Sequence, residues 1–256
     1  MNFTIDDLEF FLLILVRISG FVFTAPFLSL SNVPRRVQIG LSVFMAIVMF
    51  ETVKHTTLEY RGVIGYAGLV ITELFVGLVM GFIMNGCIQI LAFSGQIIDM
   101  EIGFSMVNVI NPAANISVTV TGNLYTYIVM LMLLATDLYR YIITAIIDAF
   151  QFIPVGQAVI RISMSQLMLT FIKDYFVIGF RIVLPMFAAT LMVNIVLGVL
   201  AKVAPQMNMF VIGMQLKVLM GIIIIALAAK YVPVVADLIY GEMRTMVKQT
   251  VSYFAP

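Results

Sequence analysis

Long apolar runs occupy most of this 256-residue chain, and four charged residues stand inside them: Arg17, Glu73, Arg181 and Lys217. Of all residues, 62% are hydrophobic and only 11% are charged, compared with about 25% charged residues in ordinary soluble domains. A charge at the centre of a bilayer costs about 2.5–3.5 kcal/mol. The sequence therefore predicts a membrane protein in which these four side chains face polar partners on other helices or other chains.

The apolar runs predict the fold class. A membrane-spanning helix needs about 20 consecutive apolar residues. By that measure we expect an all-α membrane protein with about six hydrophobic helices and no soluble domain. The expected helices fall in residues 8–30, 37–53, 62–93, 124–153, 175–200 and 207–229. The more charged tail, residues 234–256, is expected to be exposed.

Small and polar residues recur every fourth position in the third run: Glu73, Gly77, Gly81, Asn85 and Gln89. On a helix this spacing forms one stripe, and the two glycines form a GxxxG motif that lets another helix approach closely. Packing of this face against a neighbouring helix is the simpler interpretation. The alternative is a proton or ion relay through the carboxylate, since ionisable residues inside membranes often have functional roles.

Residues 94–122 form the most polar segment of the apolar chain, rich in Gly, Asn, Ser and Thr. It is either an ordinary loop outside the membrane or a re-entrant loop that lines a conduit, because irregular backbone at membrane depth must be buried in protein or face water. Asp99 and Glu101 lack the nearby histidines or cysteines of a zinc site, and they would hold Ca²⁺ or Mg²⁺ only with further ligands. We predict no metal site and no cofactor.

The sequence offers no support for catalysis or nucleic-acid binding. His55 is the only histidine and lies in a charged connection, and no catalytic or phosphate-binding motif is present. A net charge of +1 provides no basic surface for nucleic acid. The 19 methionines are core fillers or, for Met207 and Met209, parts of a pliable seal around a passing chain.

Several short motifs follow one another in an informative order. They are Arg17-Ile18-Ser19-Gly20, Ala25-Pro26-Phe27, Gly95-Gln96-Ile97-Ile98-Asp99, Pro154-Val155-Gly156, Arg181-Ile182-Val183-Leu184-Pro185, Asn194-Ile195-Val196-Leu197-Gly198 and Ala204-Pro205-Gln206-Met207-Asn208. No single motif is specific. In this order and at this length, the chain resembles the FliR family, the R subunit of the flagellar type III export gate, over nearly its whole length.

This resemblance implies a non-enzymatic subunit of the bacterial inner membrane, in the flagellar basal body. Such a subunit forms the gate with P and Q subunits, associates with FlhB-type and FlhA-type export components, and contacts membrane lipid. Unfolded flagellar proteins pass through the gate. The implied fold is a set of bent helical hairpins, in which residues 1–174 resemble a P subunit and residues 175–256 a Q-subunit hairpin.

The resemblance also implies roles for particular residues. The family's pore plug would fall on the polar segment, with candidates Met106, Asn108, Asn111, Pro112, Asn115 and Gly122. Contacts between subunits or helices would involve Arg17, Glu73, Asp99, Glu101, Arg181 and Lys217. Met207 and Met209 would help to seal the pore.

One competing function remains open from the sequence. A polytopic transporter for ions or small molecules would use Glu73 as its coupling carboxylate. Such folds combine helices broken at the midplane with internal repeats. The chain has the broken helices, at Pro185 for example, but no convincing repeat.

Overall fold

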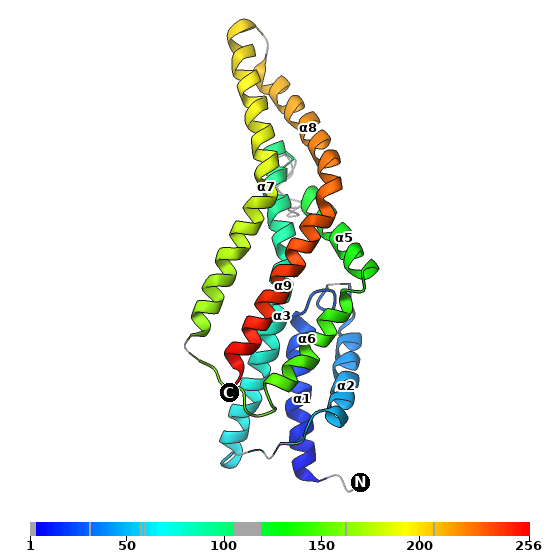
Figure 1. Cartoon of the computed structure of the whole chain (residues 1–256). Coiled ribbons are helices and arrows are strands. Elements are labelled where there is room, and N and C mark those ends of the chain that lie inside the picture. The colour runs from blue at the N-terminus through cyan, green and yellow to red at the C-terminus, as the bar shows by residue number, and fades with distance from the viewer. Residues whose placement is uncertain are drawn as a thin grey trace. The chain divides into compact units, whose positions relative to one another are not determined.

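The computed structural model describes residues 4–30, 32–56, 58, 60–104, 119–161, 163–206 and 208–256, and within them it contains helices and no strand (Figure 1). The helices are α1 (Ile5–Thr24), α2 (Arg35–Thr52), α3 (Gly62–Ile102), α5 (Val120–Ala135), α6 (Tyr139–Phe152), α7 (Met164–Val203), α8 (Met209–Ala228), the short 3₁₀ helix η2 (Ala229–Tyr231) and α9 (Val232–Phe254). The predicted all-α class is confirmed.

Fewer helices than expected can span a membrane. By length and composition, three segments of the described chain qualify, residues 62–102, 164–203 and 211–254. A fourth qualifies if α5 and α6, separated by a break at residues 136–138, count as one span. The expected number of six is therefore too high. The first two apolar runs are helical but are not among these spans. Helix α1 contains three acidic residues in addition to Arg17, and α2 begins with two arginines.

The third helix is longer than predicted. We expected it to end at Phe93, followed by the least helical region, but α3 continues to Ile102 and α5 starts at Val120. At 1.5 Å per residue, its 41 residues extend over about 60 Å, twice the roughly 30 Å hydrocarbon thickness of a bilayer. Part of α3 must therefore lie outside the hydrocarbon unless it is steeply tilted.

The C-terminal tail was predicted incorrectly. It forms helix α9, and one side of this helix is buried, including Met243, Met246, Val247 and Phe254. Its charges misled the prediction, because they lie between apolar residues that recur at helical spacing and form a buried stripe.

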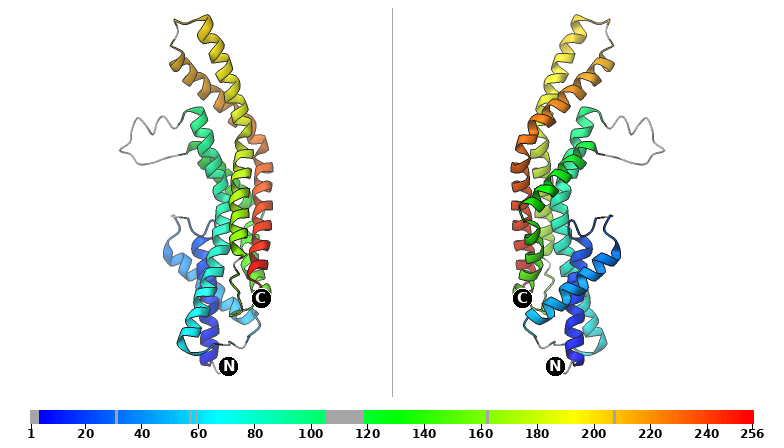
Figure 2. Two further views of the ribbon diagram at one scale, coloured as in Figure 1. Left: turned by 90° about the vertical axis from the view of Figure 1, so that its left-hand side faces the viewer. Right: turned by 90° about the vertical axis from the view of Figure 1, so that its right-hand side faces the viewer.

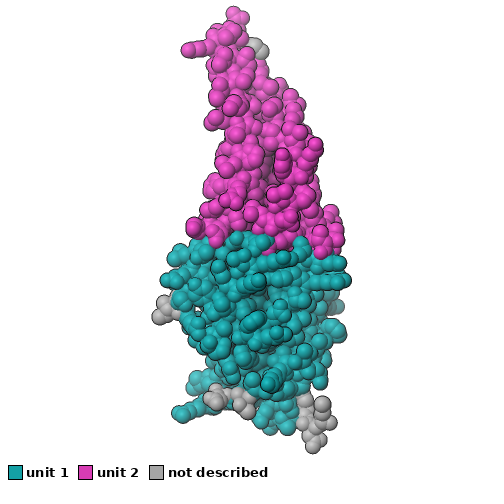
Figure 3. All heavy atoms as spheres, viewed as in Figure 1, with its two compact units in different colours: residues 1–87, 137–172, 241–256 teal, residues 88–136, 173–240 magenta. Residues whose placement is uncertain are grey.

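The chain divides into two compact units (Figure 3). Unit 1 contains residues 1–87, 137–172 and 241–256, and unit 2 contains residues 88–136 and 173–240. Each unit is therefore built from segments far apart in the sequence. The boundary expected at residues 174/175 concerns likeness to P and Q subunits and stays a prediction.

In unit 1, α1 lies beside the first part of α3 (Figure 2) and also packs against α2. The buried positions of α1 recur every three or four residues, from Phe10 to Phe21, and form one apolar stripe. Two glycines of α3 permit the close contact. A Cβ on Gly77 would collide with the backbone carbonyl of Arg17, and one on Gly81 with Thr24. The packing interpretation of the GxxxG motif is confirmed.

In unit 2, the second part of α3 packs against α5, α7 and α8. A Cβ on Gly95 of α3 would collide with the backbone of Gly122 in α5, and one on Gly221 of α8 would collide with Ile102. Phe93 contacts the rings of Tyr175, Phe176 and Phe180 on α7. Small residues at one crossing and aromatic rings at the other hold these helices together.

Candidate functional site

A buried ion pair occupies the centre of unit 1. The Nε of Arg17 on α1 donates to Glu73 on α3, and the two side chains are 0% and 1% exposed. The guanidinium also donates from Nη1 to the Ile153 carbonyl at 2.8 Å, and its Cζ lies 4.4 Å from the centre of the Phe150 ring. The pair thus joins α1, α3 and the end of α6.

The second oxygen of Glu73 binds the segment that follows α6. Its Oε1 accepts from the Gly156 amide at 2.7 Å. Gly156 has φ = +79°, in the left-handed region that glycine adopts without strain. The Pro154-Val155-Gly156 turn therefore brings an amide to the carboxylate, which interacts with two donors from different parts of the chain.

Both carboxylate oxygens of Glu73 are hydrogen-bonded within the chain, one to Arg17 and one to Gly156. The Arg17 guanidinium and the Glu73 carboxylate form a buried ion pair. Breaking such a pair is costly, because the remaining charge is buried without compensation. The geometry favours a structural role over a relay through Glu73.

The same α6–α7 segment, residues 153–161, is bonded to the end of the chain. The Val159 amide donates to the Phe254 carbonyl at 3.1 Å, and Arg161 donates to the Ala255 carbonyl at 2.9 Å. Thr56, in the connection after α2, donates to the Val155 carbonyl. The segment therefore links the ion pair to the C-terminal end of α9.

A second, exposed cluster lies at the start of α1. The backbone N–H and the hydroxyl of Thr4 both donate to the Asp7 carboxylate, and these bonds lower the pKa of Asp7. The hydroxyl of Tyr60 donates to Glu9 at 2.6 Å, which raises the pKa of Tyr60. His55 lies 3.6 Å from Asp7, with its ring against Phe10. The cluster caps α1 and connects it to the segment before α3.

In unit 2, Asp99 of α3 caps the start of α5. Both carboxylate oxygens lie 3.2 Å from the Thr121 amide, and the Thr121 hydroxyl donates to the same carboxylate. The first amides of a helix lack intrahelical partners and carry partial positive charge, so a carboxylate there is favourable. Thr119, at the N-cap, makes no such side-chain bond. Asp99 supplies the cap from another helix.

The other residues expected to form contacts have different surroundings. Glu101 accepts from the Thr190 hydroxyl of α7 at 3.2 Å. Arg181 is exposed and Lys217 half-buried, and no ion pair to either occurs within the described part of the chain. None of the acidic residues of α3 belongs to a group of three or more potential metal ligands among the described residues.

Most of the expected plug lies outside the described residues, which include none of Met106, Asn108, Asn111, Pro112 and Asn115. Gly122 is described, and it packs against α3 within helix α5. Met207 also lies outside the described residues. Met209 is the first residue of α8, and its side chain is outside the description.

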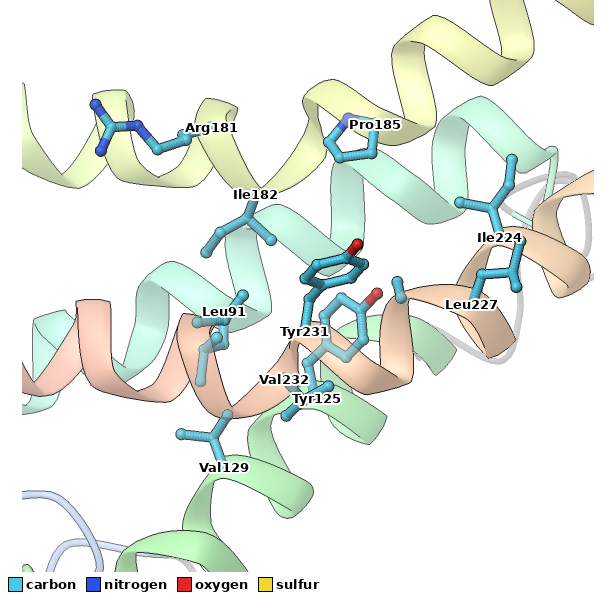
Figure 4. A pocket seen from close by; sticks show the side chains of 12 residues that line it. Leu91, Tyr125, Val129, Arg181, Ile182, Pro185, Ile224, Leu227, Tyr231 and Val232 are labelled. Carbon is cyan, nitrogen blue, oxygen red and sulfur yellow. The ribbon is translucent and has the colours of Figure 1, made fainter.

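Unit 2 also contains an apolar cavity of about 350 Å³ between α3, α5, α7 and the α8–α9 region (Figure 4). The cavity is lined by Leu91, Tyr125, Val129, Arg181, Ile182, Pro185, Ile224, Leu227, Ala228, Tyr231, Val232 and Val235. Arg181 is the only charged residue in this lining. The cavity is large enough for a small ligand, since such sites have volumes of about 300–1,000 Å³.

Sequence reasoning missed several partners. Gly156, Thr121 and Thr190 lie 83, 22 and 89 residues from the carboxylates that they bind. Long separations leave no local signal. The fourth apolar run was expected to end at residue 153, just before Pro154-Val155-Gly156, but nothing in the sequence indicated that the Gly156 amide would meet Glu73.

Taken together, the fold and these sites define a helical membrane protein whose buried polar groups bind one another and join its helices. The chain belongs to the bacterial export proteins, family 1, whose sequence profile matches residues 8–243. It is 31% identical over 245 residues to the flagellar biosynthetic protein FliR of Bacillus subtilis (strain 168), a match that covers 94% of each chain.

Two relatives with lower sequence identity have the same name. The chain is 25% identical over 239 residues to flagellar biosynthetic protein FliR of Escherichia coli (strain K12), covering 93% of this chain and 91% of the relative. It is 25% identical over 212 residues to the protein of that name from Aquifex aeolicus (strain VF5), covering 83% and 82%. These matches identify an export component and not an enzyme.

Proposed function

We propose that this chain is a subunit of the inner-membrane export gate of a flagellar type III secretion system. With P and Q subunits, it forms the channel through which unfolded flagellar proteins pass, and FlhB-type and FlhA-type components associate with it. The observation that carries this proposal is the full-length match to FliR proteins of three distant bacteria. The name of the relatives refers to flagellar biosynthesis, and the description of the family refers to export.

The exposed apolar surface supports an assembly. On α7, large apolar side chains are widely exposed, among them Leu191, Ile195 and Val199 at 55–59%. Exposed apolar patches mark surfaces that contact membrane or protein. Arg181 and Lys217 have no ion-pair partner within the described chain, which is compatible with contacts to acidic groups of other subunits.

Contacts near the two ends of the polar segment, residues 94–122, support a tethered plug. Asp99 near its start binds Thr121 near its end, and Gly95 packs against Gly122. These contacts hold the end of α3 and the start of α5 together. We propose that the plug, expected within residues 106–122, closes the pore at rest and that Met207 and Met209 help to seal it.

Copurification tests the assembly. The tagged full-length chain, expressed in its own bacterium and extracted in mild detergent, should retain two small hydrophobic chains, the P and Q subunits. Mass spectrometry identifies them. If the chain elutes alone while remaining folded, the gate assignment is wrong.

Conductance tests the plug separately. Replacing residues 106–118 with a Gly-Ser linker of equal length preserves the Asp99–Thr121 contact and should increase ion leakage through the assembled complex. The same complex with Lys202→Gln, an exposed residue near the end of α7, is the control. Equal leakage from the two complexes would rule out a plug in this segment.

The transporter alternative predicts a different phenotype. With Glu73 as the coupling group, Glu73→Gln would abolish pH-dependent uptake into vesicles while the chain stayed folded. With the structural role proposed here, the same change destabilises unit 1, and no pH-dependent uptake is found even with the wild-type chain.

A further inference from the structure

Two long helical segments of unit 2 are interrupted where they border the same cavity. Pro185 lies inside α7, and the 3₁₀ helix η2 joins α8 to α9 with no loop between them. Pro185 and Tyr231 of η2 both line the apolar cavity of this unit (Figure 4). The two interruptions therefore face one common space, although they lie far apart in the sequence.

Each interruption weakens the helix in which it occurs. Proline has no N–H, so the carbonyl of Arg181, four residues before Pro185, lacks its helical donor, and the proline ring crowds that carbonyl. In a 3₁₀ helix the hydrogen bonds have poorer geometry, and a 3₁₀ stretch inside a longer helix often marks a hinge. Both segments therefore bend more easily beside the cavity than in the turns before and after it.

On one side of these interruptions, the helices are fixed to the rest of unit 2. The ring of Phe93 on α3 contacts Tyr175 and Phe180 of α7. The hydroxyl of Tyr240 on α9 donates to the Val129 carbonyl of α5 at 2.8 Å. These contacts anchor the first part of α7 and the first part of α9.

On the other side, α7 and α8 form a hairpin (Figure 1), which we call the distal hairpin and define as residues 186–203 and 209–228. Its two helices contact each other. A Cβ on Gly213 of α8 would lie 3.0 Å from the side chain of Leu197 on α7. The distal hairpin can therefore move as one body.

The last turn of α3 holds the distal hairpin in its observed position. The hydroxyl of Thr190, a residue only 3% exposed, donates to Glu101 at 3.2 Å. Gly221 packs against Ile102, because a Cβ there would lie 2.6 Å from the isoleucine side chain. Both contacts involve the last two residues of α3, which lead into the polar segment.

We propose that the distal hairpin is a hinged arm. It pivots at Pro185 and η2, changing the size of the cavity, and the contacts of Thr190 and Gly221 with the last turn of α3 form the latch of its resting position. Release of the latch frees the end of α3, at the start of the polar segment. The hinge and the latch do not depend on the assignment of a plug to that segment.

Double electron–electron resonance tests the hinge in the full-length chain, purified with the chains that accompany it. Spin labels are attached to cysteines at Asn123 of α5 and Lys202 of α7, both exposed, and Cys87 is replaced by alanine. This background should show two distances, for the resting and the displaced arm. Pro185→Ala supplies the missing N–H to the Arg181 carbonyl and should remove the displaced population.

A second variant tests the latch without changing the hinge. Thr190→Val keeps the volume of the side chain but removes the hydroxyl bonded to Glu101. The ratio of displaced to resting arm should rise about fivefold, as expected for the loss of one hydrogen bond. Leu191→Ala, the next position and 58% exposed, is the control and should leave the ratio unchanged.

Two results would overturn the proposal. One is a single distance in the unmodified background that Thr190→Val leaves unchanged. The other is a displaced population that persists in Pro185→Ala when that variant assembles normally. If Pro185→Ala does not assemble, the comparison of Thr190→Val with Leu191→Ala decides, because neither substitution alters the proline.

Discussion

Arg17 and Glu73 form a buried ion pair in unit 1. Each was recognisable from sequence as a charge in an apolar run, but their pairing was not, because 56 residues separate them. The structure adds what the sequence lacked, namely that the Ile153 carbonyl and the Gly156 amide complete the pair. These two charges bind each other, whereas Arg181 and Lys217 have no ion-pair partner among the described residues.

Loss of either charge should therefore unfold unit 1 more readily. Glu73→Gln leaves the Arg17 guanidinium buried without a counter-charge, and we expect a loss of about 3–5 kcal/mol, the usual cost of breaking a buried pair. Cys87, the only cysteine and fully buried, reports the effect through its rate of reaction with maleimide. Glu51→Gln, at an exposed site on α2, is the matched control.

A double-mutant cycle separates pairing from packing. Arg17→Met combined with Glu73→Gln should cost less than the sum of the single changes, because neither charge is then left alone. Strict additivity would show that the two side chains do not interact.

Asp7 provides a pH dependence at the same scale. Its pKa is lowered by the backbone N–H and the hydroxyl of Thr4, so the capping contribution is present above the ordinary carboxyl pKa and is lost as pH falls through the lowered value. In an NMR titration, Thr4→Ala should move the pKa of Asp7 upward. Fraying of the first turn of α1 should then begin at a higher pH than in the wild type. An unchanged titration curve would argue against the capping box.

At the scale of elements, sequence periodicity located the helices better than their ends. The predicted end of α3 failed at Ser94, Gly95 and Asp99, polar or small residues that suggested a loop. Their neighbours explain the error: the Ser94 hydroxyl donates to the carbonyls of Ile90 and Gly179, Gly95 contacts α5, and Asp99 caps α5. These polar and small residues lie where α3 crosses other helices. Without the tertiary contacts, such a segment cannot be told from a loop.

The glycines of α3 allow a matched comparison within one helix. Gly77→Ala places a methyl group against the backbone carbonyl of Arg17, so α1 must move, and overpacking of this kind costs about 1–3 kcal/mol. Gly68→Ala meets nothing within 4 Å and should be neutral or stabilising by up to about 1 kcal/mol, because alanine favours helix. The rate at which maleimide labels Cys87 reports the stability of unit 1 in both variants. Equal rates for the two variants would contradict the close packing of α1 and α3.

At the scale of the whole molecule, sequence indicated the class but not the organisation. Apolar content predicted a helical membrane protein, and the order of motifs predicted its family. The interleaving of three separated segments in unit 1 could not be predicted, because it depends on hydrogen bonds between residues as distant as Val159 and Phe254. Counting apolar runs also overestimated the spans, since helices can be apolar toward protein as well as toward lipid.

The last segment of unit 1 yields a prediction at this scale. Phe254 is fully buried and its ring contacts Phe75 of α3, so Phe254→Ala should destabilise unit 1 by about 3–5 kcal/mol. Ser252→Ala, two residues earlier and exposed, should have little effect. Faster labelling of Cys87 in the first variant alone is the expected result. Equal labelling would mean that α9 is dispensable for the unit.

The interleaved contacts also determine when unit 1 can fold during its synthesis. The ribosome adds Arg17 136 residues before Ile153. The Phe254 carbonyl, which accepts from the Val159 amide, is made later still. At about 5–20 residues per second, the guanidinium waits on the order of ten seconds for its carbonyl. Unit 1 therefore closes only after residues 241–256 have been made. An assembling machine that recognises the closed unit would admit chains that contain residues 241–256 and leave shorter ones to proteolysis.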